Sequence, residues 1–493
     1  MGLRSRKSIE ACVAEGSGSA GLHLKRSLGV VGLTAFGVGS TVGAGIFSLT
    51  GVVAAHQAGP AVALAFVLAS VTCFFAGLCY AEFAALVPIA GSAYSYAYVT
   101  FGELVAWMVG WSLVLEWLFS ASVVAISWSG YVSALLRDAG HALPAPLTAS
   151  PLAMDAHGQL SWTGAGFDAP AVAVVVVCTL VLLLGMRTSA TVNTLIVIAK
   201  VAVLATVVAV GARYVQPENW QPFVPPNSGR FGEFGWSGVI RGAGILFFAY
   251  LGFDGVSTLA EEARDPQRVL PRSLFATLLI CTVLYVGVSL VITGLTDYRK
   301  LAVADPLYAA LAEVRGPLHL VQSLVSAVAV VGLISVVLTC LIGQIRIFFA
   351  MARDGLLPPG LCRLSSARQT PVVASLMTGA AAALIAGLVP LALVGELVSI
   401  GTLLAFAVVC AGVLVLRRIA PDAPRPFRTP WVPLIPTLGL LSCCTMMLSL
   451  PGDTWIRLLV WLAVGTAVYL AYGRSHSRLR AGSGPHDRAP HSG

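Results

Sequence analysis

Long apolar stretches separated by short polar segments run along most of the chain. From Ser27 to Ala81 there is no Asp, Glu, Lys or Arg, which is enough for two membrane spans of roughly 20 residues each, with a turn at Gly59 and Pro60. Comparable stretches continue to Tyr472. The pattern predicts about twelve membrane-spanning helices. Their expected centres are residues 40, 72, 118, 176, 203, 249, 284, 333, 381, 406, 440 and 463.

Two of the predicted helices, at residues 30–53 and 242–259, carry glycines near mid-span. Glycine weakens a helix, and lipid cannot satisfy the backbone groups that an interruption releases. Interruptions at this depth are therefore expected to be sheltered by protein and to face a small polar ligand, as in a carrier.

The order of the spans predicts an internal repeat. Five spans precede the second interrupted helix, and because five is odd, the next block of five lies upside down relative to the first. We expect inverted repeats over about 27–213 and 237–418, and two peripheral helices over about 430–474. Together these form one transmembrane domain, residues 27–474. The tails 1–26 and 475–493, rich in small and charged residues, are expected to be disordered.

Composition supports an all-α polytopic membrane protein. The chain is 57% hydrophobic and only 11% charged, and its mean hydropathy of +0.87 is far above that of soluble proteins. Of the 30 Lys and Arg residues, 21 fall in segments on the side of the N-terminus, eight on the opposite side, and Lys200 within a span. This bias predicts cytoplasmic termini, and we expect a location in the plasma (inner) membrane. The net charge of +8 then reflects attraction to the anionic inner leaflet, not to nucleic acid.

The ten cysteines show neither a zinc-type spacing nor a pair in an external loop, so we expect reduced, mostly packing residues. No metal site and no cofactor are predicted.

The interruption in the first helix centres on Gly43, Ala44 and Gly45. The half-helix that follows begins with free N–H groups at the positive end of its dipole, where the carboxylate of an amino acid would fit. The alternative is that these small residues only permit close helix packing. A matching interruption in the other helix favours the binding site.

In that other helix, the carbonyls around Phe248, Ala249 and Leu251 are candidates to accept hydrogen bonds from a substrate ammonium group. Phe248 could also cover the substrate as a lid, or serve only in packing. The two interruptions would then bind the two charged ends of a zwitterion.

Lys200 lies about eight residues from the start of its predicted helix, roughly 12 Å along the axis. A buried ammonium is costly, which makes Lys200 a functional candidate unless it snorkels to the interface. Facing inward, its charge could take the place of a bound cation, and its protonation could be coupled to transport.

Two carboxyl groups fall at membrane depth. Glu116 is either a protonated residue bonded to a neighbouring helix or part of a substrate or proton site. Asp254 follows the second interruption and could be the N-cap of the second half-helix. Glu82, Glu261 and Glu262 could form an ion-pair gate near the cytoplasmic face, although solvated charge is the alternative.

Several stretches together resemble the amino acid-polyamine-organocation superfamily and, within it, the cationic amino acid transporter family. They are residues 37–47, 80–98, 110–116, 246–271, 343–358 and 396–406.

The resemblance implies a fold like that of the leucine transporter and alternating access around a central site. It also implies proton coupling through Lys200, with Glu116 and Asp254 as the matching carboxylates. Ala44 replaces a hydroxyl residue of some relatives. Leu333 stands at a pocket position where a smaller residue would favour long basic side chains, so a neutral substrate stays open.

The sequence therefore predicts a proton-coupled permease, not an enzyme, that moves a neutral or cationic L-amino acid through the lipid bilayer. The alternatives are an amino acid exchanger, a Na⁺-coupled symporter, or a membrane amino acid sensor that does not translocate. The presence of a small accessory membrane subunit stays open.

Overall fold

The structure is a computed structural model. It describes Lys7 and residues 28–87, 92–154, 160–184, 190–258, 263–314, 318–365 and 370–479. Most of the predicted tails, and the gate residues Glu261 and Glu262, lie outside the described residues. Within the described part, nearly all secondary structure is helical, apart from one antiparallel hairpin of β1 (Leu152–Met154) and β2 (Leu160–Trp162). The predicted all-α class is confirmed.

The first half of the bundle contains one interrupted helix followed by five further helices. Its elements are α2 (Val30–Thr41), η1 (Gly45–Leu49), α3 (Thr50–Val53), η2 (Ala54–Ala58), η3 (Gly59–Ala61), α4 (Val62–Leu86), α5 (Ser92–Thr100), α6 (Glu103–Asp138), η4 (Ala145–Leu147), α7 (Ala169–Leu183), α8 (Ala190–Gly211), η5 (Ala212–Tyr214) and η6 (Pro217–Trp220).

The second half again begins with an interrupted helix. Its elements are α9 (Gly235–Leu246), η7 (Phe247–Tyr250), α10 (Gly255–Thr258), α11 (Pro266–Leu295), η9 (Tyr298–Leu301), α12 (Pro306–Glu313), α13 (His319–Arg353), η10 (Pro359–Cys362), α14 (Val372–Leu388), α15 (Leu391–Ile419), α16 (Leu434–Ser449), α17 (Gly452–Val468), η11 (Tyr469–Gly473) and α18 (Arg474–His476).

All the span centres expected from hydropathy fall on helical segments. Among the described residues, seven helical segments are long and apolar enough to cross a membrane. Four further apolar helices, α2, α7, α14 and α16, are shorter, and the total of about twelve spans stays a prediction. The chain is a multi-pass membrane protein; the assignment of inverted repeats stays a prediction.

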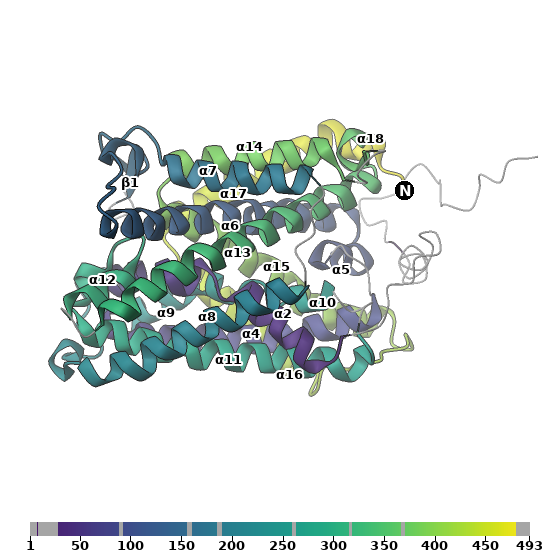
Figure 1. Cartoon of the computed structure of the whole chain (residues 1–493). Helices are drawn as coiled ribbons and strands as arrows, with labels where there is room; N and C mark the ends of the chain where they lie inside the picture. The colour runs from purple at the N-terminus through teal and green to yellow at the C-terminus, as the bar shows by residue number, and fades with distance from the viewer. Residues whose placement is uncertain are drawn as a thin grey trace, which may run out of the picture.

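The longest helices run roughly parallel, and the pieces of the interrupted helices lie among them (Figure 1). α6 packs against both α13 and α15 in the middle of the bundle. The Nζ of Lys7 lies 3.1 Å from a carboxylate oxygen of Asp354, whose carbonyl accepts the backbone N–H of Arg478. Both ends of the described chain therefore meet at one end of the bundle, called the terminal end here; the other is the distal end.

Aspartates and prolines mark where helices start. Asp168 precedes α7, and its carboxylate accepts the N–H of Ala171 at 3.0 Å and the hydroxyl of Ser129 at 2.5 Å. α11 and α12 each follow an aspartate and begin with a proline, which has no N–H to leave unsatisfied in the first turn. Such local signals fix the ends of these helices.

Candidate functional site

The first helix is interrupted at the predicted position. α2 ends at Thr41, Val42 is extended with φ −74° and ψ 94°, and helical geometry resumes at Ala44 and Gly45. The first N–H groups of the resumed helix have no carbonyl four residues earlier in helical position to accept them. The interruption therefore exposes backbone donors inside the bundle.

The second interruption also lies where the glycine pattern predicts it. Helical geometry ends at Tyr250, Leu251 is non-helical with ψ 137°, Gly252 has φ +103°, and α10 begins at Gly255. A side chain at Gly252 would be strained in this left-handed conformation.

The two interruptions touch each other. A Cβ on Gly45 would lie 2.3 Å from the Cα of Ala249, and one on Gly252 would lie 2.9 Å from the backbone of Ser40. Only glycine permits this approach. The hydroxyl of Tyr285 on α11 adds a polar link, because it lies 2.9 Å from the Thr41 carbonyl and 3.0 Å from the Ala249 carbonyl.

Lys200 on α8 points inward. Its side chain is fully buried, and its ammonium donates to the carbonyls of Gly39 at 2.8 Å and Val42 at 2.9 Å. Its methylenes pack against the backbone at Gly332 on α13. Lys200 therefore does not snorkel to the interface. Its ammonium lies inside the bundle, at the C-terminal end of α2, where the helix dipole is negative.

A small cavity lies beside the two interruptions. The hydroxyl of Thr41 faces it and has no hydrogen-bond partner among the described residues. The cavity is lined by Ser40, Thr41, Gly43, Ala44, Gly45, Trp117, Ser120, Val124, Phe248, Leu251, Gly252, Val336, Thr339 and Cys340. None of these is Asp, Glu, Lys or Arg.

Five of the residues expected at the substrate site line the cavity: Gly43, Ala44, Gly45, Phe248 and Leu251. Ala249 lies behind them, against Gly45 and Tyr285.

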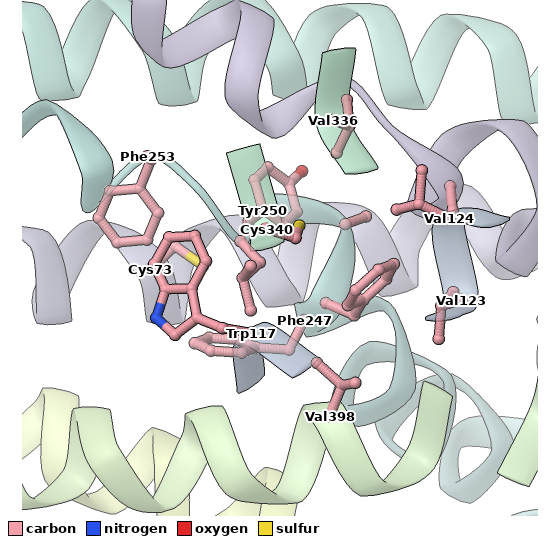
Figure 2. Packing of buried hydrophobic residues seen from close by; sticks show 14 of the residues in the cluster. Cys73, Trp117, Val123, Val124, Phe247, Tyr250, Phe253, Val336, Cys340 and Val398 are labelled. Atoms are coloured by element: carbon pink, nitrogen blue, oxygen red, sulfur yellow. The ribbon is translucent and has the colours of Figure 1, made fainter. Parts of the chain in front are cut away.

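The wall facing the interruptions comes from α6 and α13. Figure 2 shows Trp117, Val124, Val336 and Cys340 among the buried side chains of this region. Sequence reasoning missed these residues. Leu333, expected at the pocket, is fully buried on α13 outside the cavity lining.

Asp254 and Glu116 are both buried, outside the cavity lining. The N–H groups of Gly252 and Gly255 face the Asp254 carboxylate, which matches the capping alternative. Glu116 on α6 lies near Thr402 and close enough to Asp254 for the two carboxyl groups to interact electrostatically. The hydroxyl of Tyr80 lies within the field of both. Two carboxyl groups and a phenol therefore form a buried polar cluster.

Glu82 near the terminal end is not a solvated charge. Its carboxylate is fully buried, 2.9 Å from Nε of Arg417 and 3.2 Å from Nε of Arg425, and it accepts the N–H of Thr429 at 2.8 Å. These contacts join the ends of α4 and α15 and the segment before α16. The alternative of a solvated charge is wrong for Glu82, because its carboxylate is buried. The two arginines offset the cost of burying that charge.

Hydroxyl groups join several helical elements at the distal end. Ser48 on η1 is hydrogen-bonded to Ser127 on α6, and Tyr131 donates to the Phe47 carbonyl at 2.7 Å. On α12, Tyr308 donates to Asp138 at 2.5 Å; burial and this hydrogen bond raise the pKa of Tyr308 to about 12. These contacts join η1, α6 and α12 at the distal end.

Comparison with known proteins gives matches along almost the whole chain. A family model described as amino acid permease matches residues 28–469. The chain is 42% identical to the methylthioribose transporter of Bacillus subtilis (strain 168), over 97% of this chain and 99% of the relative. It is also 42% identical to a branched-chain amino acid permease of that bacterium, over 96% and 98%.

A plant protein, the vacuolar cationic amino acid transporter 4 of Arabidopsis thaliana, is 30% identical over 93% of each chain. These matches confirm the resemblance seen in the sequence. All three relatives are named as transporters or permeases, which also confirms the prediction that the chain is not an enzyme.

Proposed function

This chain belongs to the amino acid permease family, and from that premise we propose that it carries a neutral L-amino acid across the plasma membrane, coupled to protons. The proposed mechanism is alternating access around the cavity between the two interrupted helices. The observation that carries it is the set of helix ends that meet at this cavity.

Four helix ends lie at the interruptions: the end of α2, the start of η1, the end of η7 and the start of α10. Charged side chains of the protein lie at two of them. Lys200 meets the negative end of α2, and Asp254 meets the amides at the start of α10. The free amides from Ala44 onward would bind the substrate carboxylate, and the carbonyl end of η7 would bind its ammonium group. A zwitterionic substrate would thus place a charge of opposite sign at each of the two remaining helix ends.

The cavity lining supports a neutral side chain. Trp117, Val124, Val336 and Leu251 supply apolar surface, and the described residues that line the cavity include no acidic side chain to pair with a basic substrate. A branched aliphatic side chain would bury its apolar area against this wall. The branched-chain permease among the relatives supports the same substrate class.

Proton coupling is proposed for Lys200. The ammonium holds two carbonyls at the end of α2, whereas a neutral amine would bind them less strongly. Loss of the proton would therefore release α2 and favour opening of the terminal end. The Glu116 and Asp254 cluster is the proposed proton acceptor, since both carboxyl groups are buried in the bundle, where a charged carboxylate is costly.

The test is uptake of radiolabelled leucine into proteoliposomes with imposed gradients. An acidic exterior should raise the initial rate and drive accumulation, whereas an imposed Na⁺ gradient should not. Excess leucine, valine or alanine should compete, and arginine should not. Uptake that requires internal amino acid would favour the exchanger, and binding without flux would favour the sensor.

A second candidate substrate is a methylthio sugar, because the chain is as similar to a methylthioribose transporter as to the branched-chain permease. The hydroxyls of Ser40, Thr41, Ser120 and Thr339 in the cavity lining suit a polyhydroxyl ligand. Uptake of radiolabelled methylthioribose that excess leucine and valine do not reduce would favour this candidate.

The orientation is proposed from the distribution of positive charge, with the terminal end in the cytoplasm. Single cysteines placed near either terminus should react with a membrane-impermeant thiol reagent only after cells are opened. An accessory membrane subunit remains a proposal, tested by mass spectrometry of the gently solubilised protein.

A further inference from the structure

A second cavity lies outside the transport site, near the terminal end, between α7, α13 and the start of α14. Its empty volume is about 640 Å³. It is lined by Leu182, Ile342, Ile345, Arg346, Phe349, Leu364, Thr370, Pro371 and Ser375. Figure 1 shows α7 and α14 running together along one side of the bundle.

The groove faces the surroundings of the bundle, not its centre. Ile342 is 37% exposed and Leu364 is 46% exposed, and Leu376 and Met377, on the adjoining turns of α14, are also exposed. In a membrane protein, apolar side chains exposed in this way face acyl chains. The natural occupant of the groove is therefore a lipid.

The polar groups of the groove gather where a lipid headgroup would lie. Arg346 is exposed and precedes the last residue of α13 by seven positions, roughly 10 Å along the axis, so its long side chain can reach the interface. The buried hydroxyl of Thr370 has no hydrogen-bond partner among the described residues. A guanidinium and a hydroxyl donor together suit a phosphate.

We propose that this groove binds an anionic glycerophospholipid from the leaflet at the terminal end. The phosphate accepts hydrogen bonds from Arg346 and Thr370, and an acyl chain lies along Ile345 and Ile342, which are deeper in the membrane. A free phosphate would leave the apolar wall unoccupied, and a zwitterionic lipid would gain less from the charge of Arg346. If the proposed orientation is right, this leaflet is the cytoplasmic one; the lipid site itself does not depend on the orientation.

The test is lipid binding to the purified full-length protein in detergent, read by native mass spectrometry and by thermal stability. Phosphatidylglycerol is compared with phosphatidylcholine of the same acyl chains, and inorganic phosphate is added separately. The wild type should retain phosphatidylglycerol at least fivefold better than phosphatidylcholine, and phosphate alone should not shift its melting temperature.

Three variants separate the headgroup from the chain. Arg346→Gln should lose about fivefold in affinity for phosphatidylglycerol and discriminate poorly between headgroups. Ile342→Trp, which fills the groove and keeps the cation, should lose both lipids. Arg418→Gln removes an exposed cation elsewhere at the terminal end and should behave like the wild type.

Equal retention of phosphatidylglycerol by the wild type and Arg346→Gln would overturn the proposal, as would unchanged binding by Ile342→Trp. Because the readout is lipid retention, failure of the proposed transport function would not alter these outcomes. Arg346→Gln and Ile342→Trp must first elute as monodisperse protein, like the wild type. Reduced lipid retention by variants that meet this condition supports the site.

Discussion

At the first interruption, the carbonyls of Gly39 and Val42 accept hydrogen bonds from the Lys200 ammonium; at the second, the amides of Gly252 and Gly255 face the Asp254 carboxylate. The protein thus places a cation at a negative helix end in one case and an anion at a positive helix end in the other. Among the described residues, no charged side chain lines the cavity at the two remaining helix ends, which are the proposed site of a zwitterion.

The two charges also differ in origin. Lys200 belongs to α8 and reaches carbonyls about 160 residues away along the chain. Asp254 instead lies directly before α10, and its carboxylate faces amides of its own segment. Lys200 therefore links two helices, and Asp254 stabilises a local turn. Loss of the lysine should affect movement of α2, while loss of the aspartate should mainly affect the geometry and protonation of the second interruption.

The largest effect is expected from Lys200→Ala. The substitution leaves two buried carbonyls without donors and removes the proposed proton carrier, so accumulation of leucine driven by an acidic exterior should be abolished. Exchange of internal for external leucine is the companion measurement and should persist if the fold is intact.

The matched control is Lys300→Ala, which removes an exposed lysine paired with Glu313 at the distal end. It should keep the wild-type response to pH. Concentrative uptake by Lys200→Ala against a gradient would remove the lysine from the coupling mechanism.

The contact between the interruptions is tested next by Gly45→Ala. The new Cβ would lie 2.3 Å from the Ala249 backbone, so the two segments must separate, and leucine affinity should fall at least tenfold. Scintillation proximity binding measures this directly. Gly452→Ala, where no atom lies within 4 Å of the added Cβ, is the control; equal affinity for both variants would show that the close approach is dispensable.

A smaller effect is expected from Asp254→Asn. Asparagine can still cap the turn, but it lacks the charge and the titratable proton, so proton-driven uptake should fall about tenfold while leucine binding changes little. Asp168→Asn alters a capping aspartate of α7, far along the chain from the interruptions, and serves as the comparison. Uptake by Asp254→Asn at the wild-type rate would leave the carboxylate with a capping role alone.

The smallest effect is expected from Tyr285→Phe, which removes the hydroxyl between the Thr41 and Ala249 carbonyls. The loss of one buried hydrogen bond should weaken leucine binding about fivefold. Tyr469→Phe removes a hydroxyl bonded to Glu103 instead and should leave binding unchanged. If the two variants bind leucine equally well, Tyr285 does not hold the interruptions together.

The positions of the helices and of both interruptions follow from local properties of the chain. Hydropathy places every span centre on a helix, and the glycines around residues 43–45 and at Gly252 mark where helical geometry stops. Lys200 is recognisable as a candidate from the sequence alone, because a lone charged residue in an apolar stretch is costly to bury whatever its neighbours are.

Tertiary structure alone decided which faces of the helices form the cavity. α6 and α13 are apolar over most of their circumference, so no polar stripe reveals that Trp117 and Val336 line the wall while Leu333 does not. The link made by Tyr285 and the ion pairs of Glu82 join segments distant in sequence. A sequence records the cost of burying each group, but only packing determines which partner offsets that cost.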